Sequence, residues 1–160
     1  MIEFLILFAA VLVGTFGFAV LFGMKPKHLP AATLLGGLTY TVYYLVALAT
    51  PDLFLSNFAG AFFAGIAAFA LAVFYRAPAV TFSALAVIPL VPGGALYYMM
   101  SGLITGKGED FSNYGGVALR VGLGIAAGIV FSSTVVGIVR PRLHKILTRK
   151  EARKPEDGSK

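Results

Sequence analysis

Two prolines and two glycines interrupt a long apolar stretch of the sequence, within the segment VIPLVPGGALYY at positions 87–98. Pro89 and Pro92 have no backbone N–H, so each deprives a carbonyl of the preceding turn of its helical donor. Gly93 and Gly94 loosen the turn that follows. Unwound carbonyls can face a cation or an ammonium group, and the N-terminus of the next half-helix can face a carboxylate. The segment therefore predicts a solute site, unless it is only a proline kink that neighbouring groups satisfy.

The depth of this break favours the solute site. Pro89 and Pro92 follow Pro78, which opens the same uncharged run, by 11 and 14 residues. At 1.5 Å per residue they lie roughly 17–21 Å into a membrane core about 30 Å thick. Carbonyls near Leu85 and Ile88 should lose their usual helical donors there. Non-helical backbone is tolerated at that depth only when it is buried in protein or faces a water-filled cavity.

Four hydroxyl-bearing residues are further candidates for contact with a solute: Thr81, Tyr97, Tyr40 and Tyr44. Thr81 precedes the break in the same run, and Tyr97 follows it. Tyr40 and Tyr44 lie one helical turn apart on a polar ridge of the run 29–50. Their hydroxyls either contact a polar solute or form hydrogen bonds between helices.

Arg120 is the one charge within the apolar run 111–139. Three small residues share its helix face at four-residue spacing: Gly124, Gly128 and Ser132. Charges within membrane spans are rare and usually functional, which makes Arg120 a candidate site residue. Alternatively the span begins as late as Val117, and Arg120 extends to the outer headgroups.

Small residues also recur every four positions in the run 53–75, at Gly60, Ala64 and Ala68, with Ala61 and Gly65 beside them. Such rows let helix backbones approach closely in lipid. They predict either packing within one helix bundle or a face for a second polypeptide.

Five apolar runs must position these candidate residues. They cover 4–24, 29–50, 53–75, 77–106 and 111–139. About 20 apolar residues cross a bilayer as a helix. We therefore predict an all-α integral membrane protein with five transmembrane helices, the fourth broken by proline and glycine. Residues 1–139 form the membrane domain. Residues 140–160 form a basic cytoplasmic tail that continues the last helix for a few turns and then becomes disordered.

The net charge of +6 could suggest nucleic acid as a partner, but its placement indicates topology instead. Of 13 Lys and Arg, eleven fall in alternate connections and in the tail. Positively charged loops stay cytoplasmic. We therefore expect the N-terminus outside and the C-terminus inside, with the cations near anionic membrane lipids.

Several kinds of chemistry lack the residues they need. The chain has no cysteine, and His28 and His144 lie far apart, so we expect no thiol nucleophile and no metal site. No apolar run holds a Ser/His pair or a carboxylate dyad, and no phosphate-binding glycine loop is present. We expect neither an enzyme nor a cofactor. The spans also contain no acidic residue that could carry a proton.

The sequence around the break resembles the threonine/serine exporter family. The residues that carry the resemblance are Pro89, Pro92, Gly93 and Tyr97, within AVTFSALAVIPLVPGGALYYMM. The pattern extends through KPKHLPAATLLGGLTY to the basic tail and covers most of the chain. More closely, the chain is similar to the family's small split subunit, which corresponds to the C-terminal half of the fused exporters.

This resemblance implies a subunit of a secondary transporter in the bacterial cytoplasmic (inner) membrane. The implied solute is threonine or serine, with small dicarboxylates as the alternative. The implied partner is a larger, separately encoded exporter subunit with about five spans of its own. A membrane scaffold that only stabilises this partner is another alternative. The break at Pro89–Gly94 favours transport, because a scaffold needs no interrupted helix inside the membrane.

Overall fold

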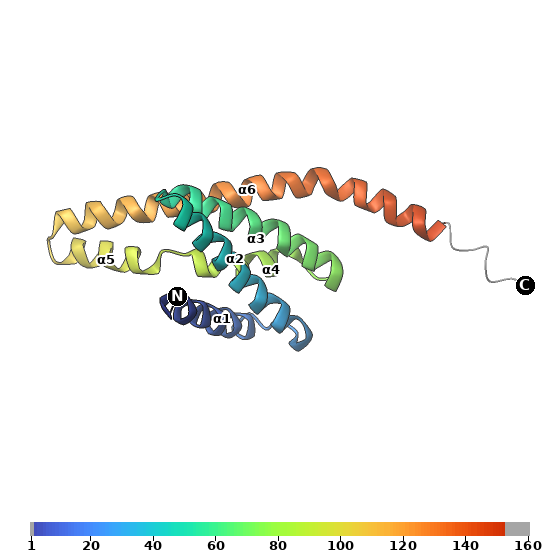
Figure 1. Cartoon of the computed structure of the whole chain (residues 1–160), viewed down its shortest axis with the longest axis horizontal. Coiled ribbons are helices and arrows are strands. Elements are labelled where there is room, and N and C mark those ends of the chain that lie inside the picture. Colours follow the sequence, from blue (N-terminus) through green and yellow to red (C-terminus); the bar gives the residue numbers. More distant parts are fainter. Residues whose placement is uncertain (1, 153–160) are drawn as a thin grey trace, which may run out of the picture.

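The computed structural model describes residues 2–152, and the side chains of residues 2–139. Within this range the chain is helical throughout, without a strand. The helices are α1 (Ile2–Leu21), α2 (Leu29–Ala49), α3 (Leu53–Tyr75), α4 (Ala79–Val87), α5 (Gly93–Ile104) and α6 (Gly108–Ala152), with 3-10 turns η1 (Pro26–His28) and η2 (Ile88–Leu90) (Figure 1). The prediction of an all-α protein is confirmed.

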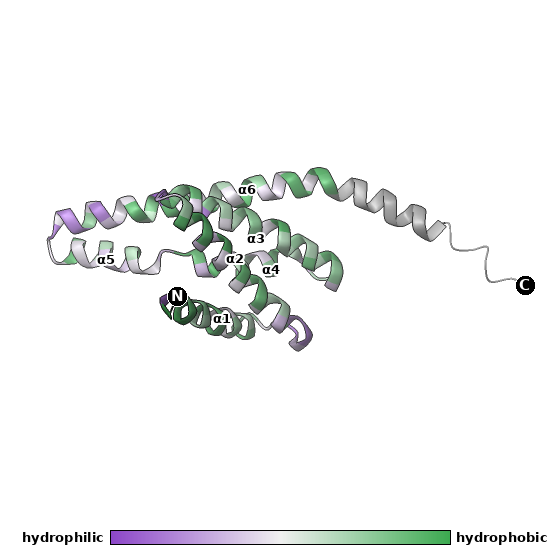
Figure 2. Cartoon of the chain, in the orientation of Figure 1, coloured by the Kyte–Doolittle hydropathy of each residue, from purple (hydrophilic) through white to green (hydrophobic). Residues whose placement is uncertain are grey.

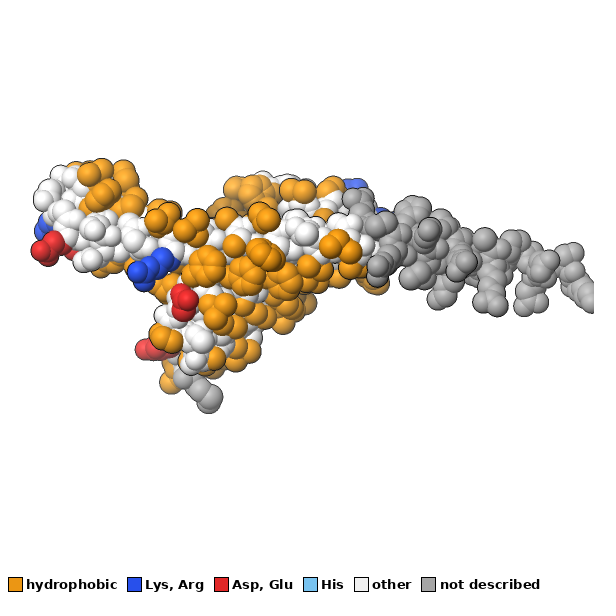
Figure 3. Space-filling model, turned by 90° about the horizontal axis from the view of Figure 1, so that it is seen from above, with side chains coloured by type: hydrophobic (Ala, Val, Ile, Leu, Met, Phe, Trp, Pro, Cys, Tyr) orange, Lys and Arg blue, Asp and Glu red, His pale blue; other side chains and the backbone are white. Residues whose placement is uncertain are grey.

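Four helices are long and apolar enough to cross a membrane, and the pair α4–η2 and α5 makes a fifth candidate span that is bent by 59°. The helices are apolar on all sides, and the hydrophilic residues gather near the connections between them (Figure 2). Hydrophobic side chains also cover much of the described surface seen in Figure 3. Helices that are apolar all round belong in lipid or in a protein core, so the chain is a multi-pass membrane protein.

Helix α3 lies at the centre of the bundle and packs against α2, α4 and α6, whereas α1 packs mainly on α2. Local sequence defines the ends of α3. Asp52 caps its N-terminus, because its Oδ1 accepts a hydrogen bond of 2.9 Å from the Phe54 N–H. At the other end Arg76 takes a left-handed conformation with φ +51°, and the Ala77 N–H closes the turn onto the Ala72 carbonyl at 3.0 Å.

The rows of small residues pack α3 and α6 against each other in a parallel pair. A Cβ on Gly124 would lie 2.6 Å from the Phe54 carbonyl oxygen, and one on Gly128 would lie 2.7 Å from the Phe58 carbonyl oxygen. Farther along, Gly65 lies directly against the Ser132 side chain. Of the two alternatives for these rows, the structure therefore shows internal packing.

After the break the chain leaves the centre of the bundle. Helix α5 packs against the first part of α6, and the two form a hairpin that turns at Gly106, where φ is +69°. Tyr98 and Tyr114 stack across it with ring centroids 5.1 Å apart. This hairpin projects past the start of α3 (Figure 1).

The predicted tail is helical as far as it is described, because α6 continues to Ala152. The predicted disordered end, 154–160, lies outside the described residues. The division into a membrane domain, 1–139, and a cytoplasmic tail remains a prediction.

Candidate functional site

The break between α4 and α5 is a short stretch of irregular backbone. The turn η2 follows α4 directly, Val91 is extended, and α5 begins at Gly93. The Val91 N–H donates to the Ile88 carbonyl at 3.2 Å, and the Gly93 N–H donates to the Val91 carbonyl at 2.8 Å. The Ile88 carbonyl lacks its usual helical donor, because the residue four positions on is Pro92, and it accepts instead from Val91 in the tighter 3-10 turn.

The break lies deep along the bundle, as predicted. A Cβ on Gly60 of α3 would lie 3.2 Å from Leu90 Cδ1 and 3.3 Å from Tyr43 Cβ, so η2 packs at this level. Gly60 is seven residues from the start of α3 and 15 residues from its end. At 1.5 Å per residue the break lies roughly 10 Å from one end of α3 and 22 Å from the other.

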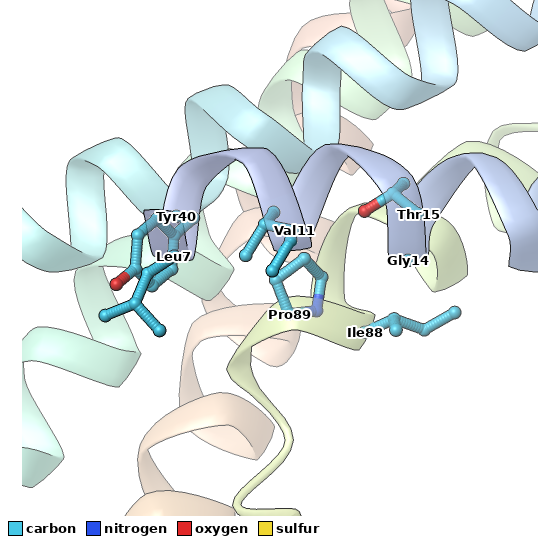
Figure 4. A pocket seen from close by; sticks show the side chains of 8 residues that line it. Leu7, Val11, Gly14, Thr15, Tyr40, Ile88 and Pro89 are labelled. Carbon is cyan, nitrogen blue, oxygen red and sulfur yellow. The ribbon is translucent and has the colours of Figure 1, made fainter. Parts of the chain in front are cut away.

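A groove of about 340 Å³ opens beside the break, between α1, α2 and η2. It is lined by Leu7, Ala10, Val11, Gly14, Thr15, Tyr40, Ile88 and Pro89. Pro89 lies beside Val11 in the middle of the groove, with Tyr40 and Thr15 toward its two ends (Figure 4). Most of the lining is apolar, so the polar groups available at the groove are two hydroxyls and the irregular main chain.

Thr15 is the part of this groove that the sequence analysis missed. Its side chain is buried, and its Oγ1 has no hydrogen-bond partner among the described residues. The side chain lies against α2, where a Cβ on Gly36 would be 2.5 Å from Oγ1. In contrast, the Thr33 and Thr41 hydroxyls donate to carbonyls four residues earlier, each at 2.9 Å. The only signal in the sequence was that Thr15 is the single hydroxyl in the run 4–24.

Tyr40 and Tyr44 both belong to the contact between α1 and α2. The Phe4 ring lies 6.2 Å from the Tyr40 ring and 4.7 Å from the Tyr44 ring, measured between centroids. Only Tyr40 also lines the groove. The structure therefore brings Tyr40 to the break and places Tyr44 in the aromatic packing behind it.

The glycines and Tyr97 follow the break in α5 and do not line this groove. Gly93 and Gly94 form the first turn of α5, where a Cβ on either would meet nothing within 4 Å. Pro92 takes the N-cap position before them, with no side chain capping the helix. Tyr97 is 69% exposed on the hairpin and lies edge-on to Tyr98 at 5.4 Å.

Two predicted residues lie well away from the groove. Thr81 of α4 lines a separate pocket at the Arg76 end of α3. Arg120 is exposed on α6, one turn before Gly124, which packs beside the first turn of α3. Arg120 is therefore level with, or just beyond, the start of α3 rather than inside the bundle, a position that fits the alternative of a side chain extending to the headgroups.

Metal ligands do not gather in the described part of the chain: it holds no group of three or more His, Cys, Asp or Glu side chains that could bind an ion. The groove beside Pro89 also contains no charged side chain. What it can offer a solute is hydrogen bonding from hydroxyls and main-chain groups in an apolar setting. Such an arrangement suits a small molecule with both polar and apolar parts.

Comparison with known protein families finds a match over most of the chain. A family model described as "Threonine/Serine exporter, ThrE" matches residues 7–135. These residues include most of α1, all of α2 to α5 and the part of α6 that packs on α3. Among curated proteins and among solved structures, the comparisons find no match.

Proposed function

Because the chain belongs to the threonine/serine exporter family, we propose that it is the small membrane subunit of a two-component secondary transporter that exports threonine or serine. The chain itself is an exporter-type transport protein with several membrane-spanning helices. The observation that carries the finer proposal is the break at Ile88–Pro92, which lies deep in the bundle beside an open groove. Transporters place solutes at such interrupted helices.

In this proposal the groove holds the solute. Its volume of about 340 Å³ is within the usual range for small-molecule sites. Main-chain carbonyls of η2 accept hydrogen bonds from the solute ammonium at the groove, and its carboxylate extends across the break to the uncapped first turn of α5. The Thr15 hydroxyl contacts its side-chain hydroxyl, and the Tyr40 hydroxyl is the second polar group of the groove, toward its other end. Because Thr15 is buried against Gly36 of α2, this contact requires α1 to move relative to α2.

The lining of the groove favours an amino acid over a small dicarboxylate. A second carboxylate needs a cation or further N–H donors, and no Lys, Arg or His lines this groove. A zwitterion carries one charge of each sign, which the carbonyls and the helix N-terminus can match. A scaffold without transport activity does not account for a groove at the break.

The hairpin of α5 and α6 supports the proposal of a larger partner subunit. It projects past the start of α3. Five large apolar or aromatic side chains of α5 are exposed on it: Leu96, Tyr97, Met100, Leu103 and Ile104. The part of α6 from Gly108 to Val139 has 32 residues and is about 48 Å long, which exceeds a membrane core of about 30 Å. Apolar side chains beyond the core need another cover, and a second polypeptide supplies it.

The proposed location is the bacterial cytoplasmic membrane, with the N-terminus outside. Lys25 and Lys27, between α1 and α2, and Arg76, after α3, lie at the same end of the bundle around one pocket. Basic connections remain on the cytoplasmic side. The hairpin that contains Lys107, Glu109 and Asp110 would then face outward.

The partnership is tested by export assays with and without the larger subunit. Expressed alone, this chain should give no efflux of labelled threonine or serine above the background of empty membranes, because the solute path needs both halves. Co-expression with the larger subunit should restore efflux, and the two should co-purify. Efflux from liposomes that contain only this purified chain would contradict the two-component proposal. A co-purified complex that exports neither amino acid would contradict the proposed solute.

Thr15→Val tests the groove as the solute site. The change replaces the hydroxyl with a methyl group of similar size, so the protein loses no internal hydrogen bond and should fold as well as the parent. If the hydroxyl binds the solute, KM for export should rise roughly fivefold, which corresponds to the loss of one hydrogen bond of about 1 kcal/mol.

Thr39→Val is the matched control. Thr39 is also buried with an unpartnered hydroxyl, but it does not line the groove. Export by this variant, divided by the amount of assembled complex, should match that of the parent chain. Equal KM values for the Thr15 and Thr39 variants would remove Thr15 from the proposed site.

A further inference from the structure

A second pocket, of about 290 Å³, lies at the opposite end of the bundle from the hairpin. It is formed where α1 and α3 end and where α2 and α4 begin. Lys25, Lys27 and Arg76 line it, and none of its lining residues is acidic. Three positive charges around one pocket repel each other, and an anion between them relieves this repulsion.

The buried side of this pocket contains an unpartnered polar group. His28 lines the pocket and is only 6% exposed, and its Nδ1 has no hydrogen-bond partner among the described residues. The ring is held edge-on between Tyr75, at 4.8 Å, and Phe82, at 6.0 Å. This aromatic packing fixes the imidazole in place, although no group in the described part of the chain uses its nitrogen. A bound ligand or an ordered water would give this nitrogen a partner.

Arg76 occupies a backbone position that is unfavourable for its residue type. It is the only described residue other than glycine with positive φ, at +51°. The corresponding position after α1 is Gly23, with φ +65°, and Gly23 lines the same pocket. Both positions close a helix with the same kind of turn, in which glycine is favoured because it has no Cβ. An arginine held there despite this cost suggests that its guanidinium has a role.

From these observations we infer that this pocket binds a phosphate group, supplied by an anionic phospholipid or by free phosphate. A guanidinium and two ammonium groups match the several acceptor oxygens of phosphate. The pocket lies where the apolar helices end, which is the depth of a lipid headgroup. Apolar side chains beside the cations, Phe22 and Met24 among them, suit the non-polar part of a lipid. This inference does not depend on which solute is exported.

Arg76→Gly tests the site, because it removes the guanidinium while favouring the observed backbone conformation. The full chain, purified in uncharged detergent, is mixed with phosphatidylglycerol or phosphatidylcholine, and the retained lipid is measured by native mass spectrometry. In a separate arm, inorganic phosphate binding is measured by calorimetry. We expect the parent chain to retain phosphatidylglycerol in preference to phosphatidylcholine, or to bind inorganic phosphate. Arg76→Gly should weaken that binding about tenfold.

Lys107→Gln is the matched control, since it removes one cation from the α5–α6 turn, outside this pocket. It should leave binding unchanged, whereas Lys27→Gln should weaken it. Retention of phosphatidylglycerol alone identifies a lipid as the source, and binding of inorganic phosphate identifies a free anion; both support the site. Equal binding by the parent, Arg76→Gly and Lys27→Gln chains would overturn it. Displacement of phosphate by millimolar threonine would also overturn it, because the pocket would then bind a carboxylate.

Discussion

Replacement of both prolines at the break, Pro89→Ala with Pro92→Ala, is expected to abolish export while leaving the protein in the membrane. Each alanine restores an N–H donor and removes a ring that clashes with the preceding turn. A proline in a helix interior costs roughly 3 kcal/mol relative to alanine, so the double change strongly favours a continuous helix. Straightening the 59° bend would carry α5 away from its place on α6 and remove the irregular backbone beside the groove.

We expect efflux per assembled complex to fall at least about tenfold, which requires only about 1.4 kcal/mol in the barrier to transport. The measurement is efflux of labelled threonine or serine, normalised to the amount of complex recovered with the larger subunit. Pro30→Ala is the matched control, because Pro30 lies in the first turn of α2, where proline is tolerated, and does not line the groove. Normal efflux per complex in the double variant would show that the break is a structural kink.

The second large effect is expected on folding, from Gly128→Leu in the contact between α3 and α6. A Cβ at this position would lie 2.7 Å from the Phe58 carbonyl oxygen, 2.7 Å from Ala61 Cβ and 2.9 Å from the Phe62 backbone nitrogen. Two of these atoms are backbone, so the side chain cannot move aside and the helices must separate. Overpacking of this kind typically costs 1–3 kcal/mol, and a leucine against backbone should reach roughly the upper end of that range.

Gly122→Leu provides the control on the same helix. Gly122 is exposed, and a Cβ there would meet nothing within 4 Å. Leucine also has a better helix propensity than glycine, so this variant should be as stable as the parent chain or more stable. The free energy of unfolding is measured in mixed micelles of increasing denaturing detergent. If the two leucine variants unfold together, α3 and α6 do not pack through Gly128.

The sequence was sufficient for the features that the bilayer imposes on any chain. A segment that crosses lipid must satisfy its own backbone hydrogen bonds and be apolar over about 20 residues. Its length and composition can therefore be read from the sequence alone. The run predicted at 53–75 is α3 (Leu53–Tyr75), and the run 29–50 ends one residue after α2 (Leu29–Ala49). The break was equally visible, because proline cannot donate a hydrogen bond in any surroundings.

Tertiary structure alone decided which of these features meet. Lipid is as apolar as the helices, so helix pairing depends on close fit between small residues rather than on hydrophobicity, and fit is a property of two surfaces. Thus Gly128 against Phe58 and Ala61, the return of α5 along α6, and Thr15 beside Pro89 could not be read from hydropathy. For the same reason Tyr97, four helical positions from Gly93 in the sequence, lies outside the groove, while Thr15, more than 70 positions from Pro89, lines it.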